Sequence, residues 1–323
     1  MPTRRTALAL LAGAPLAATA RAQGSFPDQP VRMIIPFAPG GPADIIGRIV
    51  GRAMGDRLGQ PVVIDSRSGA GGVVGVEAGA RARPDGQTVV LASTGALVVL
   101  PHMMPRMPYD PQRDLAPIVH VLSVPQILVV RRQRNLTSLR GLVDEAKRSP
   151  GRLTFGSAGI GSSLHLAGEL FKLRAGIDIN HVPYRGAAPA ITDLLAGNID
   201  MILADVPIVL PGTRSGELVA LGVTADARSP ALPDVPTFTE SGIPGVISET
   251  WYALFAPAGT PPDRITKLHD AVTGALSDPE VRRSLTDQGG MIAGGTSDAL
   301  AALLRSEYAK WGEIVRVSGA KLE

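Results

Sequence analysis

The sequence predicts an α/β protein made of two domains, and three observations lead to this prediction. The chain has 323 residues, which is more than one hydrophobic core usually serves. Short apolar strands alternate with amphipathic helices along most of it, and this alternation is typical of a mainly parallel sheet with helices on both faces. A second series of such units begins near Val121, so we expect each series to form its own domain.

The first series opens with an apolar strand and a glycine-rich loop. After this loop Ile46, Val50 and Met54 recur at helical spacing on one face, which predicts an amphipathic helix. The same kind of unit then repeats. In chain order we expect a strand at 31–37, a helix from 44, a strand at 62–65, a glycine loop at 69–72, a helix at 73–83 and a strand at 88–93.

The second series repeats these units and leads into a helical C-terminal part. Prolines interleaved with apolar residues at 229–244 indicate a segment that crosses between the domains. In the last helix Leu300, Leu304 and Trp311 form a stripe, which predicts a docking face and a structural role for Trp311. We expect strands at 126–130, 153–155, 181–184, 200–203, 218–223 and 251–256, and helices at 138–148, 164–171, 189–195, 262–276, 279–287 and 297–317.

Residues 1–22 have the features of a secretory signal peptide. An arginine pair at positions 4–5 precedes an apolar stretch that ends in the cleavage motif Ala20-Arg21-Ala22. The arginine pair leaves both the Sec and the twin-arginine export routes open. No later stretch approaches the ~20 apolar residues that a membrane span needs, so we expect export to the periplasm.

Composition excludes several classes of function. The chain has no cysteine, which removes disulfides, thiolate metal sites and cysteine nucleophiles. Its formal charge of +3 comes from three arginines in the signal segment, and the remainder balances 29 basic against 29 acidic side chains. A neutral chain without runs of Lys and Arg is not expected to bind nucleic acid.

Known catalytic and cofactor motifs are mostly absent from the sequence, and the S-x-x-K at 318–321 lacks its companion motifs. The sequence has no G-x-S-x-G, H-E-x-x-H or Walker A sequence, and its five histidines lack metal-ligand spacing. The glycine run at 69–75 is close to a dinucleotide-binding fingerprint, but the fingerprint requires glycine where Val74 stands. We therefore expect no catalytic residue, no cofactor and no metal.

Two glycine-rich loops stand at equivalent places in the two series. Each follows a strand and opens a helix, at 39–41 in the first series and at 159–163 in the second. Free backbone N–H groups at a helix start form an anion site when no side chain blocks the approach. One such loop alone would be explained by a tight turn. Two loops at matching positions favour a ligand, with a carboxylate as the anion.

Seven short segments carry a resemblance to a known family. They are FAPGGPAD at 37–44, LGQPVV at 58–63, GAGG at 69–72, PDG at 84–86, LHLAGELF at 164–171, HVPY at 181–184 and RSPALPDVP at 228–236. In this order they resemble the Bug receptors, which are the periplasmic substrate-binding proteins of tripartite tricarboxylate transporters. The resemblance spans the whole chain after the signal segment.

The resemblance implies a two-domain periplasmic-binding-protein fold, similar to type II, with two crossing strands and an interdomain cleft. Domain 1 would comprise 23–122 and 248–323, and domain 2 would comprise 123–247. A small carboxylate would be held in the cleft through backbone amides and ordered water. The partners would be this ligand and the membrane permease subunits of the transporter, and we expect a monomer.

The resemblance also implies which residues contact the ligand. The first domain would supply Ala38, Gly40, Gly41, Asp44, Ser93 and Thr94, and the second would supply Ser157, Gly159, Ser162, Ser163, His165, Tyr184 and Asp205. Ala43 stands where the family has a hydroxyl residue, and Ala204-Asp205 stands where it often has Asp-Asn. His165 is open to a second interpretation, as a cap or a residue behind the site, and Arg185 is expected to be a solvated surface charge.

The leading hypothesis is a receptor without catalytic activity. The alternative is an exported α/β enzyme, similar to a hydrolase, that uses the same cleft, because Ser162 and His165 are close in the sequence. No third orienting group is apparent, which favours the receptor. The sequence does not decide whether the receptor serves transport or signalling. It also does not identify the ligand, and the candidates are dicarboxylates, tricarboxylates, acidic amino acids and aromatic acids.

Overall fold

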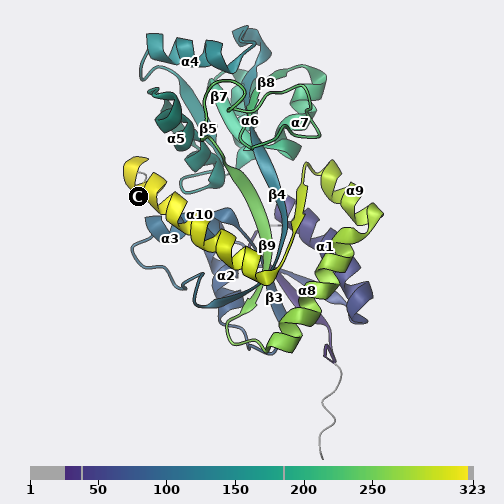
Figure 1. Cartoon of the computed structure of the whole chain (residues 1–323). Coiled ribbons are helices and arrows are strands. Elements are labelled where there is room, and N and C mark those ends of the chain that lie inside the picture. The colour runs from purple at the N-terminus through teal and green to yellow at the C-terminus, as the bar shows by residue number, and fades with distance from the viewer. Residues whose placement is uncertain (1–25, 38, 185, 319–323) are drawn as a thin grey trace, which may run out of the picture.

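The structure is a computed structural model that describes residues 26–37, 39–184 and 186–318. Three sequence expectations therefore lie outside the described residues: the signal peptide at 1–22, Ala38 in the first glycine loop, and Arg185. Within the described residues the chain forms two α/β halves joined by long shared strands (Figure 1).

The first half is built on three parallel strands. Strand β1 (Val31–Ile35) lies in the middle and pairs in parallel with β2 (Val62–Ser66) and β3 (Thr88–Ser93). Helices α1 (Pro42–Leu58) and α2 (Val73–Ala80) connect these strands. The predicted strands and helices of this half are confirmed, although β1 ends two residues and α2 three residues earlier than expected.

The second half repeats this arrangement. Strand β5 (Thr154–Ser157) pairs in parallel with β6 (Asn180–Pro183) and β7 (Met201–Asp205). Its helices are α4 (Leu139–Arg148), α5 (Ser163–Ala175), α6 (Ala187–Ala196) and α7 (Val206–Ser215). Helix α7 was not among the predicted elements, because Pro207 and Pro211 interrupt its helical pattern.

Two long strands cross between the halves. Strand β4 (Leu115–Arg131) pairs antiparallel with β9 (Glu249–Pro257) along the first part of its length. It then continues into the second half, where it pairs with β7 and β8 (Leu218–Val223). Because β9 also pairs with β3, the sheet runs in the order β2-β1-β3-β9-β4-β7-β5-β6. Figure 1 shows both strands passing through the centre of the molecule.

The expectation of a mainly parallel sheet is wrong. Among the described strands, four pairs are parallel and five are antiparallel. The antiparallel pairs all involve β4 or β9, and the sequence indicated only residues 126–130 of β4. Pro117 and Pro125 break the strand signal in its first part, since proline cannot donate to a ladder, and the pairing register shifts just after Pro117.

The C-terminal part supports both halves. Helices α8 (Pro262–Ser277) and α9 (Pro279–Asp287), strand β10 (Met291–Gly294) and helix α10 (Ser297–Ser318) follow β9. As predicted, Leu300, Leu304 and Trp311 are buried where α10 docks. Helix α10 packs against β4, against the π-helical segment η2 (Gly95–Val99) and against α5, so it touches elements of both halves.

Candidate ligand-binding site

A cavity of about 870 Å³ lies between the two halves. The first half contributes the β1–α1 loop and Ser93 at the end of β3, and the crossing strand β9 contributes Thr250 and Tyr252. The second half contributes the β5–α5 loop and the start of α7. The parallel strands of both halves thus point their carboxyl ends at one space, which is the usual ligand position in open α/β sheets.

The starts of four helices meet at this cavity. Lining residues include Gly41 before α1, Ser162 before α5, Gly186 before α6 and Asp205 before α7. The first N–H groups of a helix have no partner within it, and the helix dipole makes this end favourable for negative charge. No Lys, Arg or His occurs in the described part of the lining. The described lining therefore offers an anion backbone N–H groups, helix dipoles and hydroxyl groups such as those of Ser93 and Tyr252, but no positive side chain.

In the first loop, Asp44 holds the backbone in place. Its Oδ2 atom accepts the Gly40 N–H at 3.0 Å and the Arg48 Nε–H at 2.9 Å. These hydrogen bonds, that from Arg48 first, lower the pKa of Asp44 below its ordinary value. Asp44 is buried and is not part of the cavity lining, whereas Gly40 and Gly41 are. The Gly40 N–H is thus committed to Asp44 in this conformation and is not free for a ligand.

In the second loop, serine and histidine side chains take the same role. The Gly159 N–H donates to Ser157 Oγ at 3.1 Å, and the Gly161 N–H donates to His165 Nδ1 at 3.2 Å. Ser162 caps helix α5 by accepting the His165 backbone N–H, and its hydroxyl donates to the Gly159 carbonyl at 2.7 Å. The N–H groups of Ser163 and Leu164 have no acceptor among the described residues, and both residues line the cavity.

His165 lies behind the second loop, stacked on His181 with ring centroids 4.0 Å apart. Burial lowers the pKa of His165 to about 3, with smaller contributions from His181 and Lys172. Burial likewise lowers the pKa of His181 to about 4. Both imidazoles are therefore neutral at pH 7, and Nδ1 of His165 is free of a proton and able to accept the Gly161 N–H.

The expected site residues divide into two groups. Those that line the cavity are Gly40, Gly41, Ser93, Ser162, Ser163 and Asp205. Those within the described residues that do not line it are Asp44, Thr94, Ser157, Gly159, His165 and Tyr184. The Thr94 hydroxyl binds backbone groups of β9, and the Tyr184 hydroxyl donates to Asp193 at 2.7 Å. Most residues of this second group lie outside the lining and hold the loops in place through hydrogen bonds.

Thr250 and Tyr252 are lining residues that the sequence analysis missed. The pairing of Ser93 with Tyr252 places those two side chains on one face of the sheet, and Thr250, two residues earlier, shares that face. The only signal available was the alternation of β9, since the partners lie about 160 positions apart in the chain. The apolar walls were also missed: Phe37, Leu100, Met104, Ile160 and Ile208.

Asp205 and Thr250 form a polar floor. The Thr250 hydroxyl donates to Asp205 Oδ1 at 2.9 Å, and Ser163 Oγ lies 2.9 Å from Thr250 Oγ1. Burial raises the pKa of Asp205 to about 7, against the opposing effect of the Thr250 hydrogen bond. A carboxyl group at the floor of this cavity therefore changes protonation near neutral pH.

The geometry does not assemble a nucleophile and a base in the cavity. Ser162 donates to a carbonyl and the Nδ1 atom of His165 is occupied by Gly161, so no described contact joins the Ser162 hydroxyl to that ring. Ser157 does meet His181 Nε2 at 2.6 Å, but neither residue lines the cavity. No group of three or more His, Asp or Glu within the described ranges could hold a metal ion.

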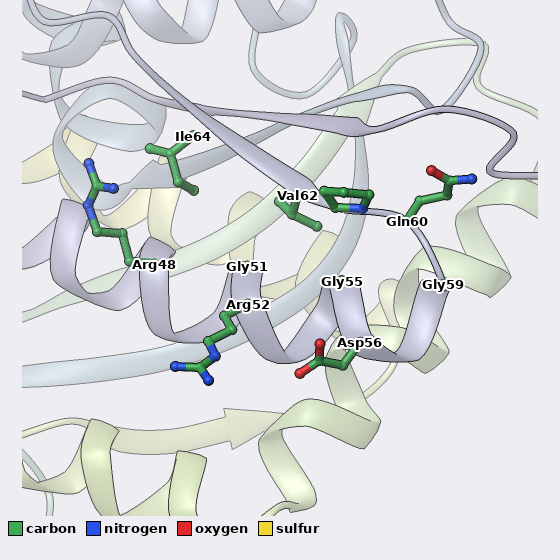
Figure 2. Close-up of a pocket in the computed structure, with 10 residues that line it drawn as sticks. Arg48, Gly51, Arg52, Gly55, Asp56, Gly59, Gln60, Val62 and Ile64 are labelled. Carbon is green, nitrogen blue, oxygen red and sulfur yellow. The ribbon is translucent and has the colours of Figure 1, made fainter.

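A second hollow of about 610 Å³ follows helix α1 beside β2. Figure 2 shows Gly51 and Gly55 on the side of α1 that faces Val62, with Arg52 and Asp56 on the other side. A Cβ atom at Gly51 would lie 3.3 Å from the Val62 side chain, so these glycines allow the helix to pack closely on the strand. The hollow follows from that packing and lies away from the carboxyl ends of the strands.

Comparison with known proteins gives one consistent family. The model for the tripartite tricarboxylate transporter family receptor, TctC, matches residues 46–320. Protein BugT of Bordetella pertussis is 40% identical over 93% of this chain and 92% of its own.

None of the helices in the described ranges combines the length and the apolar composition that crossing a bilayer requires.

Solved structures are similar over nearly the whole chain. Rpa4515 of R. palustris with adipate has a TM-score of 0.84 and 32% identity, covering 92% of this chain and 100% of that chain. MatC from Rhodopseudomonas palustris with bound malate has a TM-score of 0.79 and 32% identity, covering 90% of this chain and 100% of that one. These likenesses, together with a periplasmic binding protein, BugD, at a TM-score of 0.80, establish the two-domain binding-protein fold.

Proposed function

The chain belongs to the tripartite tricarboxylate transporter receptor family, and from this premise we propose that it captures a small organic carboxylate in the periplasm and delivers it to a membrane permease. The carboxylate would occupy the cavity between the halves. Relatives whose structures contain adipate and malate support this class of ligand.

One observation carries the proposal. Four helices begin at a cavity whose described lining contains no basic side chain, so the N–H groups of Ser163 and Leu164 and the adjoining helix dipoles supply its positive potential. The helix starts of such a site recognise the carboxylate, and the other lining residues determine what else the ligand can carry. The alternative of a hydrolase is not favoured, because the cavity contains no paired nucleophile and base among the described residues.

The test compares acids with their neutral amides by calorimetry. Adipate, malate and benzoate are titrated into the protein alongside adipamide, malamide and benzamide. We expect at least one acid to bind and its amide to bind about ten- to a hundredfold more weakly, the range expected for loss of charge-assisted hydrogen bonds. Native mass spectrometry of protein from its host would identify a retained acid. Absence of any bound or retained acid would contradict the proposal.

We also propose that the two halves close on the ligand as rigid bodies. Support comes from the connections: β4 and β9 cross between halves that each carry one ligand loop. Domain 1 would comprise 23–122 and 248–323, domain 2 would comprise 123–247, and the hinges would lie near 121 and 247. Small-angle scattering should give a smaller radius of gyration with a binding acid than without it. An unchanged radius at saturation would argue for a fixed cavity.

A further inference from the structure

A directed chain of hydrogen bonds ends at Asp205. The Thr250 hydroxyl has one proton, and it points to Asp205 Oδ1 at 2.9 Å. Ser163, whose Oγ lies 2.9 Å from Thr250 Oγ1, must therefore donate to Thr250, and Gln126 Nε2 also donates there at 3.4 Å. Ser163 and Gln126 thus donate to Thr250, and Thr250 donates to Asp205, which leaves Asp205 as the acceptor at the end of the chain.

The other oxygen of this carboxyl group lacks a donor. Asp205 is 5% exposed and lines the cavity, and no described residue donates to its Oδ2 atom. The titratable group that the structure places against it is Tyr252, whose pKa is raised by burial and, to a smaller extent, by the Asp205 charge. No described lining residue carries a positive charge. Because Asp205 lines the cavity, this oxygen is open to a ligand, and a ligand that donates a hydrogen bond to it gains affinity.

This acceptor lies close to the anion end of the cavity. Ser163 is the first residue of helix α5, where open N–H groups would hold the carboxylate, and two hydrogen bonds of 2.9 Å connect its hydroxyl to Asp205. A ligand group that reaches Asp205 therefore lies only a few bonds from the ligand carboxylate. The remaining walls, Phe37, Leu100, Met104, Ile160 and Ile208, suit an apolar body.

We propose that the ligand is a monocarboxylate with a hydroxyl or amino group on the carbon next to the carboxylate and an apolar side chain, and that Asp205 determines this specificity by accepting a hydrogen bond from that group. The inference rests on the proposed carboxylate receptor function. A second carboxylate at the same carbon is repelled by Asp205 and finds no positive side chain in the described lining.

The test uses four ligands with one shared skeleton, titrated by calorimetry at pH 8. They are 3-phenylpropanoate, 3-phenyllactate, phenylalanine and benzylmalonate, which carry H, OH, NH₃⁺ and COO⁻ on the carbon next to the carboxylate. We expect phenyllactate or phenylalanine to bind about tenfold or more tightly than phenylpropanoate, and benzylmalonate to bind weakest.

Asp205→Asn provides the matched variant, with the exposed Asp56→Asn as a control for net charge. In Asp205→Asn the preference for the amino ligand should disappear and benzylmalonate should gain relative to phenylpropanoate, while Asp56→Asn should leave the order unchanged. A second readout needs no variant. Lowering the pH from 8 to 5.5 protonates Asp205, so binding of phenylalanine should weaken relative to phenylpropanoate.

Three outcomes would overturn the inference. One is equal or tighter binding of phenylpropanoate or benzylmalonate in the unmodified protein at pH 8. Another is the same ligand order in Asp205→Asn when that variant is folded by circular dichroism. The third is no binding by any of the four. In each case the carboxylate receptor still stands if an acid is retained or binds in the acid–amide comparison, so the two failures are distinguishable.

Discussion

The two glycine-rich loops solve one structural problem with different chemistry. In both, the side chain of the third helical residue accepts the N–H of the glycine just before the N-cap: Asp44 accepts from Gly40 at 3.0 Å, and His165 accepts from Gly161 at 3.2 Å. The first acceptor is an ionised carboxylate paired with the exposed Arg48, and the second is a buried neutral imidazole. Equivalent geometry therefore does not imply an equivalent response to pH or mutation.

The largest expected difference between the two loops is in how stability depends on pH below 6.5. An unfolded histidine takes up a proton below about pH 6.5, whereas His165 in the folded protein does so only at a pKa of about 3. Its contribution to stability is present above pH 6.5 and is lost as the pH falls, at about 1.4 kcal/mol per pH unit. In His165→Asn the Asn Oδ1 accepts the same N–H without titrating. Urea unfolding between pH 6.5 and 4 should therefore show a shallower loss of stability in this variant.

Asp44 supplies the control for that experiment. Because its pKa is lowered, Asp44 remains ionised over this range, and its contribution is lost only as the pH falls through that lowered pKa. Asp44→Asn should thus keep the pH dependence of the unmodified protein between pH 6.5 and 4. Equal slopes in the unmodified protein and His165→Asn would show that His165 is protonated in the folded protein.

A smaller difference is expected for alanine at the two glycines. Both have positive φ, +83° at Gly40 and +78° at Gly161, so each substitution should lower the free energy of unfolding by about 1 kcal/mol. A Cβ at Gly161 would also lie 2.8 Å from the Leu100 side chain, whereas at Gly40 it meets no described atom within 4 Å. Gly161→Ala should cost about 1 kcal/mol more. Urea denaturation of both variants decides this, and equal losses would contradict the crowding at Leu100.

The smallest effect is expected for Asp44→Asn at pH 7. The asparagine oxygen can still accept the Gly40 N–H, so what is lost is the charge pairing with Arg48, whose side chain is 57% exposed. Asp44 is buried, but the exposed Arg48 can be solvated when the charge opposite it is removed, so we expect a loss of about 1 kcal/mol or less. Thermal and urea unfolding should agree on a change within that limit. A loss of several kcal/mol would mean that the charge on Asp44, and not its acceptor geometry, holds the first loop.

These loops also show what the sequence can and cannot predict. Strand, glycine loop and helix follow from local composition, and both loops were placed correctly at the helix starts. Asp44 was expected to contact the ligand, and His165 either to contact it or to act as a cap or a residue behind the site; neither residue lines the cavity in this conformation. Their position on the first helical turn is a local property, but whether a side chain turns back to its own loop or out to the cavity depends on packing from distant segments.

Long-range pairing accounts for most of the rest. Thr250 and Tyr252 reach the cavity because β9 lies between β3 and β4. No local pattern at 250–252 predicts that β9 pairs with these two strands. Leu100 and Met104 form part of the apolar wall from a segment for which no element was predicted, a π-helical turn followed by α3 (Leu100–Met103). The family resemblance supplied the crossing strands that local patterns alone did not.

If, as proposed, the backbone N–H groups of Ser163 and Leu164 hold the carboxylate, this has an evolutionary consequence. Most point mutations exchange a side chain and leave the amide in place, so the recognition of the carboxylate is protected from most single substitutions, proline aside. Variation at Phe37, Met104 and Ile208 can instead reshape the walls without disturbing that recognition. Homologous receptors with this cavity could therefore change their ligand specificity through single substitutions in its walls. Each protein along such a series would still bind a carboxylic acid.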